Sequence, residues 1–597
     1  GYHVLRAVSV HGEAAAALIV TPAWLGVPER LGAGPAWGLA AQLYSVRSGQ
    51  SWGVGDLTDM TDLAVWSGAE HGADFLLVNP LHAGEPAAPL EPSPYLPMSR
   101  RFVNPLYLRP ERVPEYATMQ GTERVKIDRR AKALHRKLDG VDAIDRDTAF
   151  TAKLAALRVL YAAPRTPGRE ADFRAFCSRE GRALSDFATW MALATEYGAN
   201  FRKWPTVLQH PDSPETAAYA EQHREEVTFH MWLQWLLDEQ IQAAQAKAVA
   251  AGMCLGIVHD LAVGVHPAGA DAWRLQDIYA TGMHVGAPPD AFNQMGQDWS
   301  QPPWRPDRLA EAGYAPFRDM IAAVLRHAGG VRVDHIIGLF RLWWVPVGNG
   351  PAEGTYVRYD HEAMVGILAL EAHRAGAVVI GEDLGVVEPS AREYLAARGL
   401  LGTSILWFER DESGRPLPAE KWRELCLASV TTHDLPPTAG YLAGDHVRLR
   451  NALGLLTRTY EEEVAADEAE RRSWLDELHG RGLLDEGTAQ DDSSGIEATV
   501  RALHEYLTLT PARLLSVSLA DAVADRRTQN QPGTTDEYPN WRVPLSGPDG
   551  APLTLEEVLT SPQVAALVEV FHGASSGAAS PGSRPAARRL TSGRELL

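Results

Sequence analysis

The chain has 597 residues, 45% of them hydrophobic, so it is long enough to bury a large core in more than one domain. Its formal net charge of −20 excludes nucleic acid and anionic membrane surfaces as expected partners. Three scattered cysteines exclude a disulfide framework or a zinc site, and no apolar run reaches membrane-spanning length. We therefore expect a cytoplasmic protein, and the acidic balance is typical of an enzyme with a neutral substrate.

The two ends of the chain differ in composition from its middle. Residues 1–35 alternate apolar and polar side chains, which predicts strands. The chain does not begin with Met, and we interpret this segment as the remnant of an N-terminal β domain. Residues 573–597 are rich in Ala, Ser, Gly and Arg, which predicts a flexible tail.

Between these ends, short apolar runs alternate with helical segments, as in a parallel α/β barrel. A mostly helical stretch, about residues 111–245, is too long for an ordinary barrel connection and predicts an inserted subdomain. The sequence therefore predicts a (β/α)8 TIM barrel over residues 36–572, with helical subdomains inserted on its C-terminal face. The expected strands cover residues 37–44, 73–80, 254–260, 329–334, 377–382, 402–408, 427–434 and 514–520.

Four of the expected strands end on an acid, and three of these acids are candidates for catalysis. Asp334, Glu382 and Asp434 each close an apolar run, and the carboxyl ends of barrel strands converge on one face. Period-two alternation places Arg332 on the same face as Asp334, so we expect the guanidinium to hold this carboxylate ionised. One such pair is equally well explained as a structural ion pair, whereas three strand-end acids favour an active site.

Glycoside chemistry requires one ionised carboxylate and one protonated carboxyl across the scissile bond. Asp334 beside Arg332 suits the ionised role, and Glu382, at the end of an apolar strand, suits a general acid with a raised pKa. Asp434 would stabilise positive charge as the sugar ring flattens. Three acids at strand ends also suit a Mg²⁺ site, and the pattern alone leaves that alternative open, although we favour carbohydrate chemistry.

Two segments between the expected strands place aromatic residues among glycines and prolines. The first holds Tyr95 within Ser93-Pro-Tyr-Leu-Pro97, where Tyr95 is either a packing residue or a platform for a sugar ring. The second, from Gly286 to Trp304, has no periodic pattern, which predicts a lid rather than a regular element. The chain has 17 Trp, which weakly favours a sugar-binding surface, since aromatic faces stack on sugars and also fill cores.

Several short motifs stand at the expected strand ends and in the loops beyond them. They are Arg332-Val-Asp-His335, Glu382-Asp-Leu-Gly385, Thr432-His-Asp434, Ser93-Pro-Tyr95, Gly286-Ala-Pro-Pro-Asp290 and Asn540-Trp541-Arg542. In combination they resemble the 4-alpha-glucanotransferase family (amylomaltase or disproportionating enzyme, glycoside hydrolase family 77). The likeness spans roughly residues 36–572, and the N-terminal β segment is similar to that of the longer actinobacterial members.

The resemblance implies an activity and a role for each motif residue. It implies transfer of a segment of an α-1,4-glucan to a 4-hydroxyl of glucose or a maltooligosaccharide, by a retaining double displacement without metal or organic cofactor. Asp334 would be the nucleophile, Glu382 the acid/base and Asp434 the transition-state stabiliser. Sugar-binding roles are implied for a second set of residues: Tyr95, Asp260, Trp299, Arg332, His335 and His433.

One departure from the family pattern concerns the lid. Many members read Gly-Asn-Pro after the lid tryptophan, where this chain has Ser300-Gln301-Pro302. The difference bears on the acceptor side of the site rather than on the reacting groups.

Two competing functions would use the same features. A hydrolase of the same clan would use the same three acids and would differ in its products from a short maltooligosaccharide. A non-catalytic glucan-binding protein belongs to a different class, and an intact set of acids argues against it.

Overall fold

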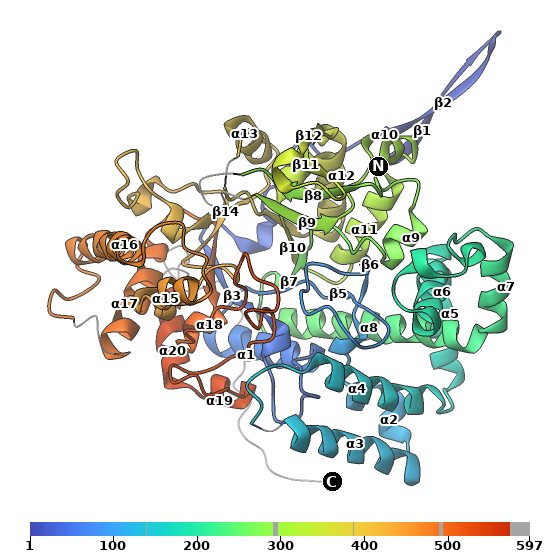
Figure 1. The fold of residues 1–597 in the computed structure, drawn as a ribbon, viewed down its shortest axis with the longest axis horizontal. Coiled ribbons are helices and arrows are strands. Elements are labelled where there is room, and N and C mark those ends of the chain that lie inside the picture. The colour runs from blue at the N-terminus through green and yellow to red at the C-terminus, as the bar shows by residue number, and fades with distance from the viewer. Residues whose placement is uncertain (139, 290–295, 386, 489–492, 573–597) are drawn as a thin grey trace.

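Eight short parallel strands form a barrel at the centre of the structure (Figure 1). The computed structural model describes residues 1–138, 140–289, 296–385, 387–488 and 493–572. The barrel strands are β3 (Ala36–Ala41), β4 (Phe75–Val78), β7 (Gly256–Leu261), β10 (Gly330–Val333), β13 (Val378–Gly381), β14 (Gly402–Ile405), β15 (Cys426–Ser429) and β16 (Leu514–Ser518). Their order is β13-β10-β7-β4-β3-β16-β15-β14. The barrel closes where the amide of Gly381 donates to the carbonyl of Leu401 at 2.7 Å.

The strands overlap the apolar runs that the sequence predicts, with β3, β7 and β15 each extending one residue beyond them, and the predicted (β/α)8 barrel is confirmed. Parallel strands covered by helices are buried on both faces, so they read as continuous apolar runs rather than as alternating ones. β13 is such a run, and all four of its residues are buried. Each predicted run is a little longer than the strand, because apolar residues continue into the turns that flank it.

A long helix completes the connection between β4 and β7. α8 (Arg224–Ala250) packs along α1 (Leu57–His71) and against β7, so it covers the barrel wall itself. The other helices of the long excursion lie to one side of the barrel in Figure 1. The predicted boundary of the inserted subdomain near residue 245 falls inside α8, and the division of the chain into domains stays a prediction. The helices that lie to one side of the barrel are α2 (Pro114–Thr118), α3 (Thr122–Leu138), α4 (Arg146–Tyr161), α5 (Pro167–Glu180), α6 (Arg182–Tyr197) and α7 (Pro214–Gln222).

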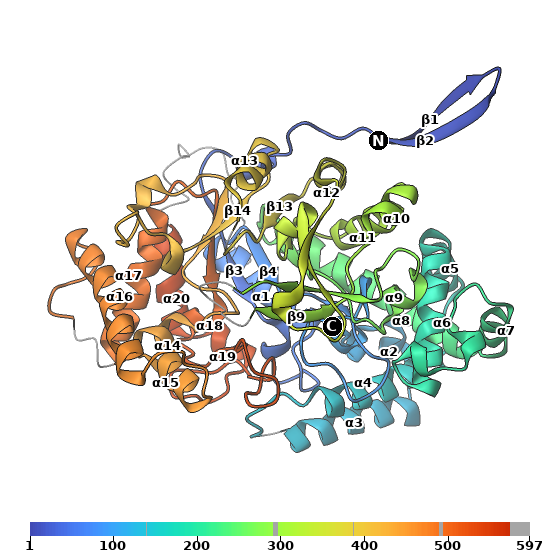
Figure 2. The same cartoon turned by 45° about the horizontal axis from the view of Figure 1, so that its top comes forward.

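A hairpin at the N-terminus projects away from the rest of the molecule (Figure 2). Strands β1 (Tyr2–Ser9) and β2 (Gly12–Ile19) pair along their whole length, which confirms the predicted strands. Their apolar side chains face solvent; Val8, for example, is 78% exposed. A lone two-stranded hairpin is marginally stable in water, and an exposed apolar surface of this kind is a common contact surface for other parts of a protein. The N-terminal β domain stays a prediction.

A four-stranded antiparallel sheet combines two strands that precede β10 in the chain with two that follow it. Its order is β12 (Thr355–Arg358), β11 (Arg341–Pro346), β8 (Met283–Ala287) and β9 (Gln297–Gln301). The prediction of a lid without regular structure over residues 286–304 is therefore wrong for β8 and β9, because β11 pairs with β8 and β8 pairs with β9, and local sequence does not reveal these partners. Asp290 of the predicted motif lies outside the described residues.

The remaining elements cover the barrel and its mouth. The helices are α9 (Ala270–Arg274), α10 (Pro306–Glu311), α11 (Ala315–Leu325), α12 (His361–Ala375), α13 (Pro389–Ala397), α14 (Thr438–Leu442), α15 (Asp445–Ala452), α16 (Tyr460–Gly480), α17 (Ser493–Thr508), α18 (Leu519–Ala522), α19 (Leu555–Leu559) and α20 (Pro562–Val568); two short strands, β5 (His82–Ala83) and β6 (Ser99–Val103), form a separate pair. Within the described ranges, none of these helices has the length and apolarity needed to cross a membrane. The predicted tail, residues 573–597, falls outside those ranges.

Candidate active site

The carboxylates of Asp334 and Glu382 leave the barrel side by side. β10 and β13 are paired in parallel with Val333 opposite Gly381, and each acid is the next residue of its strand. The amide of Glu382 donates to the carbonyl of Val333 at 2.9 Å, which continues the pairing to the very end of the strands. Adjacent parallel strands lie about 4.8 Å apart, so the two side chains emerge as neighbours at the same rim.

A buried guanidinium links Asp334 to the next strand. Arg332 Nη1 lies 3.1 Å from Asp334 Oδ1 and donates to both oxygens of Asp260 at 2.8 and 2.9 Å. β10 and β7 are paired with Arg332 opposite Asp260, so the pairing itself sets this contact. Tyr95 donates its hydroxyl to Asp260 Oδ2 at 2.7 Å. Four of the predicted site residues thus form one hydrogen-bonded cluster.

The expectation that Arg332 holds Asp334 ionised needs correction. Burial raises the pKa of Asp334 to about 7; Arg332 opposes this shift, and the nearby carboxylates of Asp260 and Glu382 add to it. The guanidinium gives its two shortest contacts to Asp260, so its charge is divided between two carboxylates. Period-two alternation predicted the contact with Asp334 but not the burial that outweighs it.

Glu382 is held by two backbone amides. Its Oε2 accepts a hydrogen bond from the amide of His335 at 2.9 Å, and its Oε1 accepts one from the amide of Leu384 at 2.7 Å. The left-handed backbone of His335, with φ of 45°, lies directly beside this contact. Burial raises the pKa of Glu382, even though Arg332 and the two amides oppose the shift. The predicted raised pKa of this carboxyl is therefore confirmed.

Asp434 lies in a loop and not at a strand end. β15 ends at Ser429, so the predicted strand to residue 434 is wrong in its last residues. The side chain of Asp434 is 49% exposed and pairs with His433 Nε2 at 3.2 Å. Asn530 donates its side-chain amide to Asp434 Oδ1 at 2.9 Å. Although burial alone would raise the pKa of Asp434, the charge of His433 and these hydrogen bonds lower it well below its ordinary range.

Aromatic side chains line both sides of the three acids. The ring of Tyr95 stacks on His433 with centroids 5.0 Å apart and lies 5.4 Å from the ring of Trp541. On the other side, Trp299 meets His335 edge to face at 5.3 Å. All nine predicted site residues therefore lie in or beside one connected group at the barrel mouth.

Asn530 and Trp541 were not predicted as site residues. The motifs Asn530-Gln-Pro-Gly533 and Asn540-Trp-Arg542 predict a loop that returns near the top of the barrel, but local sequence does not reveal that Asn530 contacts Asp434. Trp541 has a left-handed backbone with φ of 61°, which is unusual for a bulky residue. Such strain is more often found at a site than elsewhere, but it is invisible in the sequence.

The lid motif Ser300-Gln301 also contributes to the arrangement. Ser300 has a left-handed backbone with φ of 60°, a conformation that glycine adopts without strain. Gln301 donates its side-chain amide to the carbonyl of Tyr95 at 2.9 Å. β9 thus fastens the loop that holds Tyr95, while the predicted effect on acceptor contacts stays a prediction.

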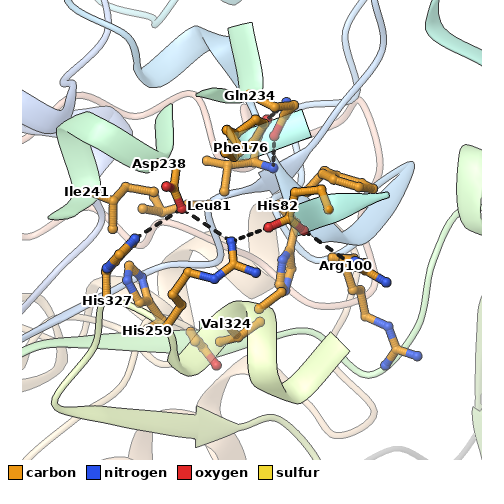
Figure 3. A pocket seen from close by; sticks show the side chains of 17 residues that line it. Leu81, His82, Arg100, Phe176, Gln234, Asp238, Ile241, His259, Val324 and His327 are labelled. Atoms are coloured by element: carbon orange, nitrogen blue, oxygen red, sulfur yellow. Dashed lines mark hydrogen bonds and ion pairs between the residues drawn. The ribbon is translucent and has the colours of Figure 1, made fainter. Parts of the chain in front are cut away.

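Three cavities beside the barrel touch residues of the candidate site, and one of them, of about 500 Å³, is lined by Asp334 and His335. Another cavity, of about 890 Å³, opens among the barrel strand ends and touches Asp260, Arg332 and His433. The third cavity, of about 680 Å³, lies against His259 on the outer side of β7 (Figure 3). In Figure 3 the charged groups of this third cavity pair with one another, as in the 3.0 Å contact of Asp238 with His327.

The described part of the chain contains no group of three or more His, Cys, Asp or Glu arranged to hold a metal ion.

A family model described as 4-alpha-glucanotransferase, glycoside hydrolase family 77, matches residues 41–549. The 4-alpha-glucanotransferase of Mycobacterium tuberculosis is 61% identical over 584 residues, which cover 96% of this chain and 80% of that protein. The chain belongs to the 4-alpha-glucanotransferase family.

Solved structures agree with this membership. The crystal structure of amylomaltase from Corynebacterium glutamicum is 46% identical, covers 96% of this chain and 80% of its own, and superposes with a TM-score of 0.87. An amylomaltase from Streptococcus agalactiae, only 16% identical, shares the fold with a TM-score of 0.71 over 90% of this chain and 99% of its own. The predicted family, fold and 4-alpha-glucanotransferase activity are therefore confirmed.

Proposed function

We propose that this member of the family transfers α-1,4-glucan segments by a retaining double displacement in which Asp334 is the nucleophile and Glu382 the acid/base. The observation that supports these roles best is the pair of acids at the ends of adjacent strands, with Arg332 between Asp334 and Asp260. Maltooligosaccharides would serve as donor and acceptor. The free thiols of Cys177 and Cys426 fit the reducing cytoplasm that we propose as its location.

In the first step, Glu382 gives its proton to the glycosidic oxygen while the Asp334 carboxylate attacks the anomeric carbon. The bond to the leaving sugar breaks, its oxygen keeps the proton, and a glycosyl ester forms on Asp334. In the second step, Glu382 removes the proton from the 4-hydroxyl of the acceptor, whose oxygen displaces Asp334. Two inversions at the same carbon give net retention. The second step returns Glu382 to its protonated form and Asp334 to its free carboxylate.

Asp434 and the surrounding residues would act on the sugar rather than on the bond that breaks. A lowered pKa keeps Asp434 ionised, so it can stabilise positive charge on the flattened ring and accept hydrogen bonds from sugar hydroxyls. We propose that Arg332, Asp260, His335 and His433 bind hydroxyls near the reacting carbon. Tyr95 and Trp299 would stack on the rings, since each presents an aromatic face beside the acids.

Transfer is distinguished from hydrolysis by what reaches the glycosyl ester. An acceptor held over Asp334 has the effective-molarity advantage of an oriented reactant, which bulk water lacks. With maltotriose as the only substrate, we expect glucose together with a ladder of longer maltooligosaccharides and almost no net gain in reducing ends. Chromatography of the products and a reducing-end assay on the same samples measure both. Reducing ends that rise in step with substrate loss, without longer products, would instead identify a hydrolase.

The pH dependence of kcat/KM should reflect the free enzyme's two acids. Asp334 must be ionised to attack, and burial raises its pKa to about 7, so kcat/KM should fall as the pH decreases below about 7. An unperturbed aspartate would keep kcat/KM constant down to about pH 4. Initial rates of maltotriose conversion between pH 4 and 9 would measure the profile, and a flat profile between pH 5 and 7 would contradict this assignment.

A further inference from the structure

Arg146, the first residue of α4, is a buried cation near the barrel mouth. The residue is 8% exposed, and its Nη1 is buried without a hydrogen-bond partner. In the described ranges no carboxylate lies within ion-pair distance of it. Burying an unpaired charge is costly. Its guanidinium carbon instead lies 4.5 Å from the ring centre of Tyr44, whose face attracts a cation.

Tyr44 connects this cation to the third acid of the site. Tyr44 is fully buried just after β3 and donates its hydroxyl to Gln529 Oε1 at 3.0 Å. The next residue, Asn530, donates to Asp434 Oδ1 at 2.9 Å. The carbonyl of Gln529 also accepts from the amide of Trp541 at 2.8 Å. One loop therefore carries the partner of Asp434 and an aromatic side chain of the site, and Tyr44 fastens it.

The start of α4 reaches the site by two further contacts. The amide of Ile144 donates to the carbonyl of Arg542 at 2.7 Å, at the other end of the same loop. Asp147 Oδ1 accepts from the amide of Leu90 at 2.9 Å, in the loop that holds Tyr95. Residues 144–147 thus contact both the loop that carries Tyr95 and the loop that carries Trp541.

We propose that Arg146 is a positioning residue of this enzyme, which acts through Tyr44 and Gln529 to hold Asn530 against Asp434. The proposal rests on the proposed role of Asp434. A cation over the phenol ring draws electron density from it and makes its hydroxyl a stronger donor to Gln529. A neutral side chain of equal length would fill the same space but would not strengthen this hydrogen bond.

The test compares kcat and KM of Arg146→Met, Arg146→Lys and Tyr44→Phe with maltotriose. We expect Arg146→Met and Tyr44→Phe to lower kcat by about 10- to 100-fold, because a small misplacement of a catalytic group costs about this much. KM should change by less than about threefold, since the sugar-binding residues stay in place. Arg146→Lys should recover most of the loss because it retains the cation.

Arg158→Met is the matched control. Arg158 belongs to the same helix and also lies over an aromatic ring, with its guanidinium carbon 4.1 Å from the ring centre of Phe229. It pairs with Glu226 and takes no part in the contacts that link Arg146 to Asp434. Its kcat should equal that of the parent. Thermal unfolding of every variant separates lost positioning from lost folding, and Tyr44→Phe, which removes a single hydroxyl, serves if Arg146→Met does not fold.

A double-mutant cycle with Asn530→Ala decides between positioning and general packing. If Arg146 acts through Asn530, Arg146→Met should cost little more once Asn530 is already truncated. Additive losses, a folded Arg146→Met with parental kcat, or an Arg146→Lys as slow as Arg146→Met would each overturn the proposal. Asp434→Asn with parental turnover would instead remove the proposed role of Asp434, on which the inference depends.

Discussion

Replacing Asp334 with Asn should abolish glucan transfer, lowering kcat with maltotriose by at least about 10⁴-fold, as loss of a nucleophile does in other enzymes. An amide cannot form the glycosyl ester, yet it has the size of the carboxylate and can keep an oxygen beside Arg332 Nη1, which lies 3.1 Å from Asp334 Oδ1. The effect should therefore appear in kcat and much less in KM. Glucose release from maltotriose measures it.

Stability measurements on the same variant provide an independent check. Burial raises the pKa of Asp334 to about 7, whereas an unfolded aspartate titrates near about 3.9. Between these values the folded state binds more protons than the unfolded state, so this group makes the parent less stable as the pH rises from 4 to 7. Asn carries no such group. Asp334→Asn should therefore have a higher Tm than the parent at pH 8, and this advantage should vanish near pH 4.

Two controls make the outcome decisive. Asp334→Ala excludes slow deamidation of Asn back to Asp as a source of residual turnover. Asp307→Asn removes an exposed carboxylate, 57% exposed and paired with Arg305, and should leave both turnover and Tm unchanged. If Asp334→Ala converted maltotriose within about tenfold of the parent rate, Asp334 would be excluded as the nucleophile. Alanine has no group that could form the glycosyl ester.

The barrel could be predicted from the sequence because its strands are buried on both faces. Runs such as Val378–Gly381 are apolar without alternation, and no other common element of that length has this pattern. The sheet formed by β8, β9, β11 and β12 could not be predicted in this way. β8 pairs with β11 although β9, two helices and β10 lie between them in the chain, and the pairing of β8 with β9 shifts register between Val285 and Gly286, so no regular period marks it.

The acids of the site could be predicted because strand ends are defined by the same apolar runs. Asp334 and Glu382 follow their strands directly, and pairing of β10 with β13 brings them together. The position of Asp434 was less predictable, because Thr431 and Thr432 have high strand propensity although the ladder ends at Ser429. The contact of Asn530 with Asp434 spans 96 residues and depends on how a loop folds back. Period and propensity carry no information on such contacts.

Glu382→Gln should lower kcat with maltotriose by about 10²- to 10⁴-fold, the range expected for loss of a general acid/base. The amide has no proton to give to the leaving oxygen. It also replaces one acceptor by a donor, and both Oε atoms of Glu382 now accept from backbone amides, so one of these two hydrogen bonds will be lost. A donor whose leaving group needs no proton should react with this variant even though it lacks the general acid.

α-Maltosyl fluoride is such a donor, since fluoride leaves as an anion. With Glu382→Gln we expect the glycosyl ester to form and persist, because no base remains to activate an acceptor. Intact mass spectrometry should then show the enzyme heavier by one maltosyl group, and peptide mapping should place that group on Asp334. The double variant Asp334→Asn with Glu382→Gln should stay unlabelled under the same conditions.

Azide turns this trapped state into a test of stereochemistry. Azide is already an anion and needs no general base, so it should displace Asp334 and restore turnover of α-maltosyl fluoride by Glu382→Gln. Attack on the ester from the face that the leaving group vacated gives α-maltosyl azide, which corresponds to net retention. Proton NMR of the product distinguishes the anomers by the coupling constant of the anomeric proton. β-Maltosyl azide would show that azide reacted directly with the donor, and the double displacement through Asp334 would then be excluded.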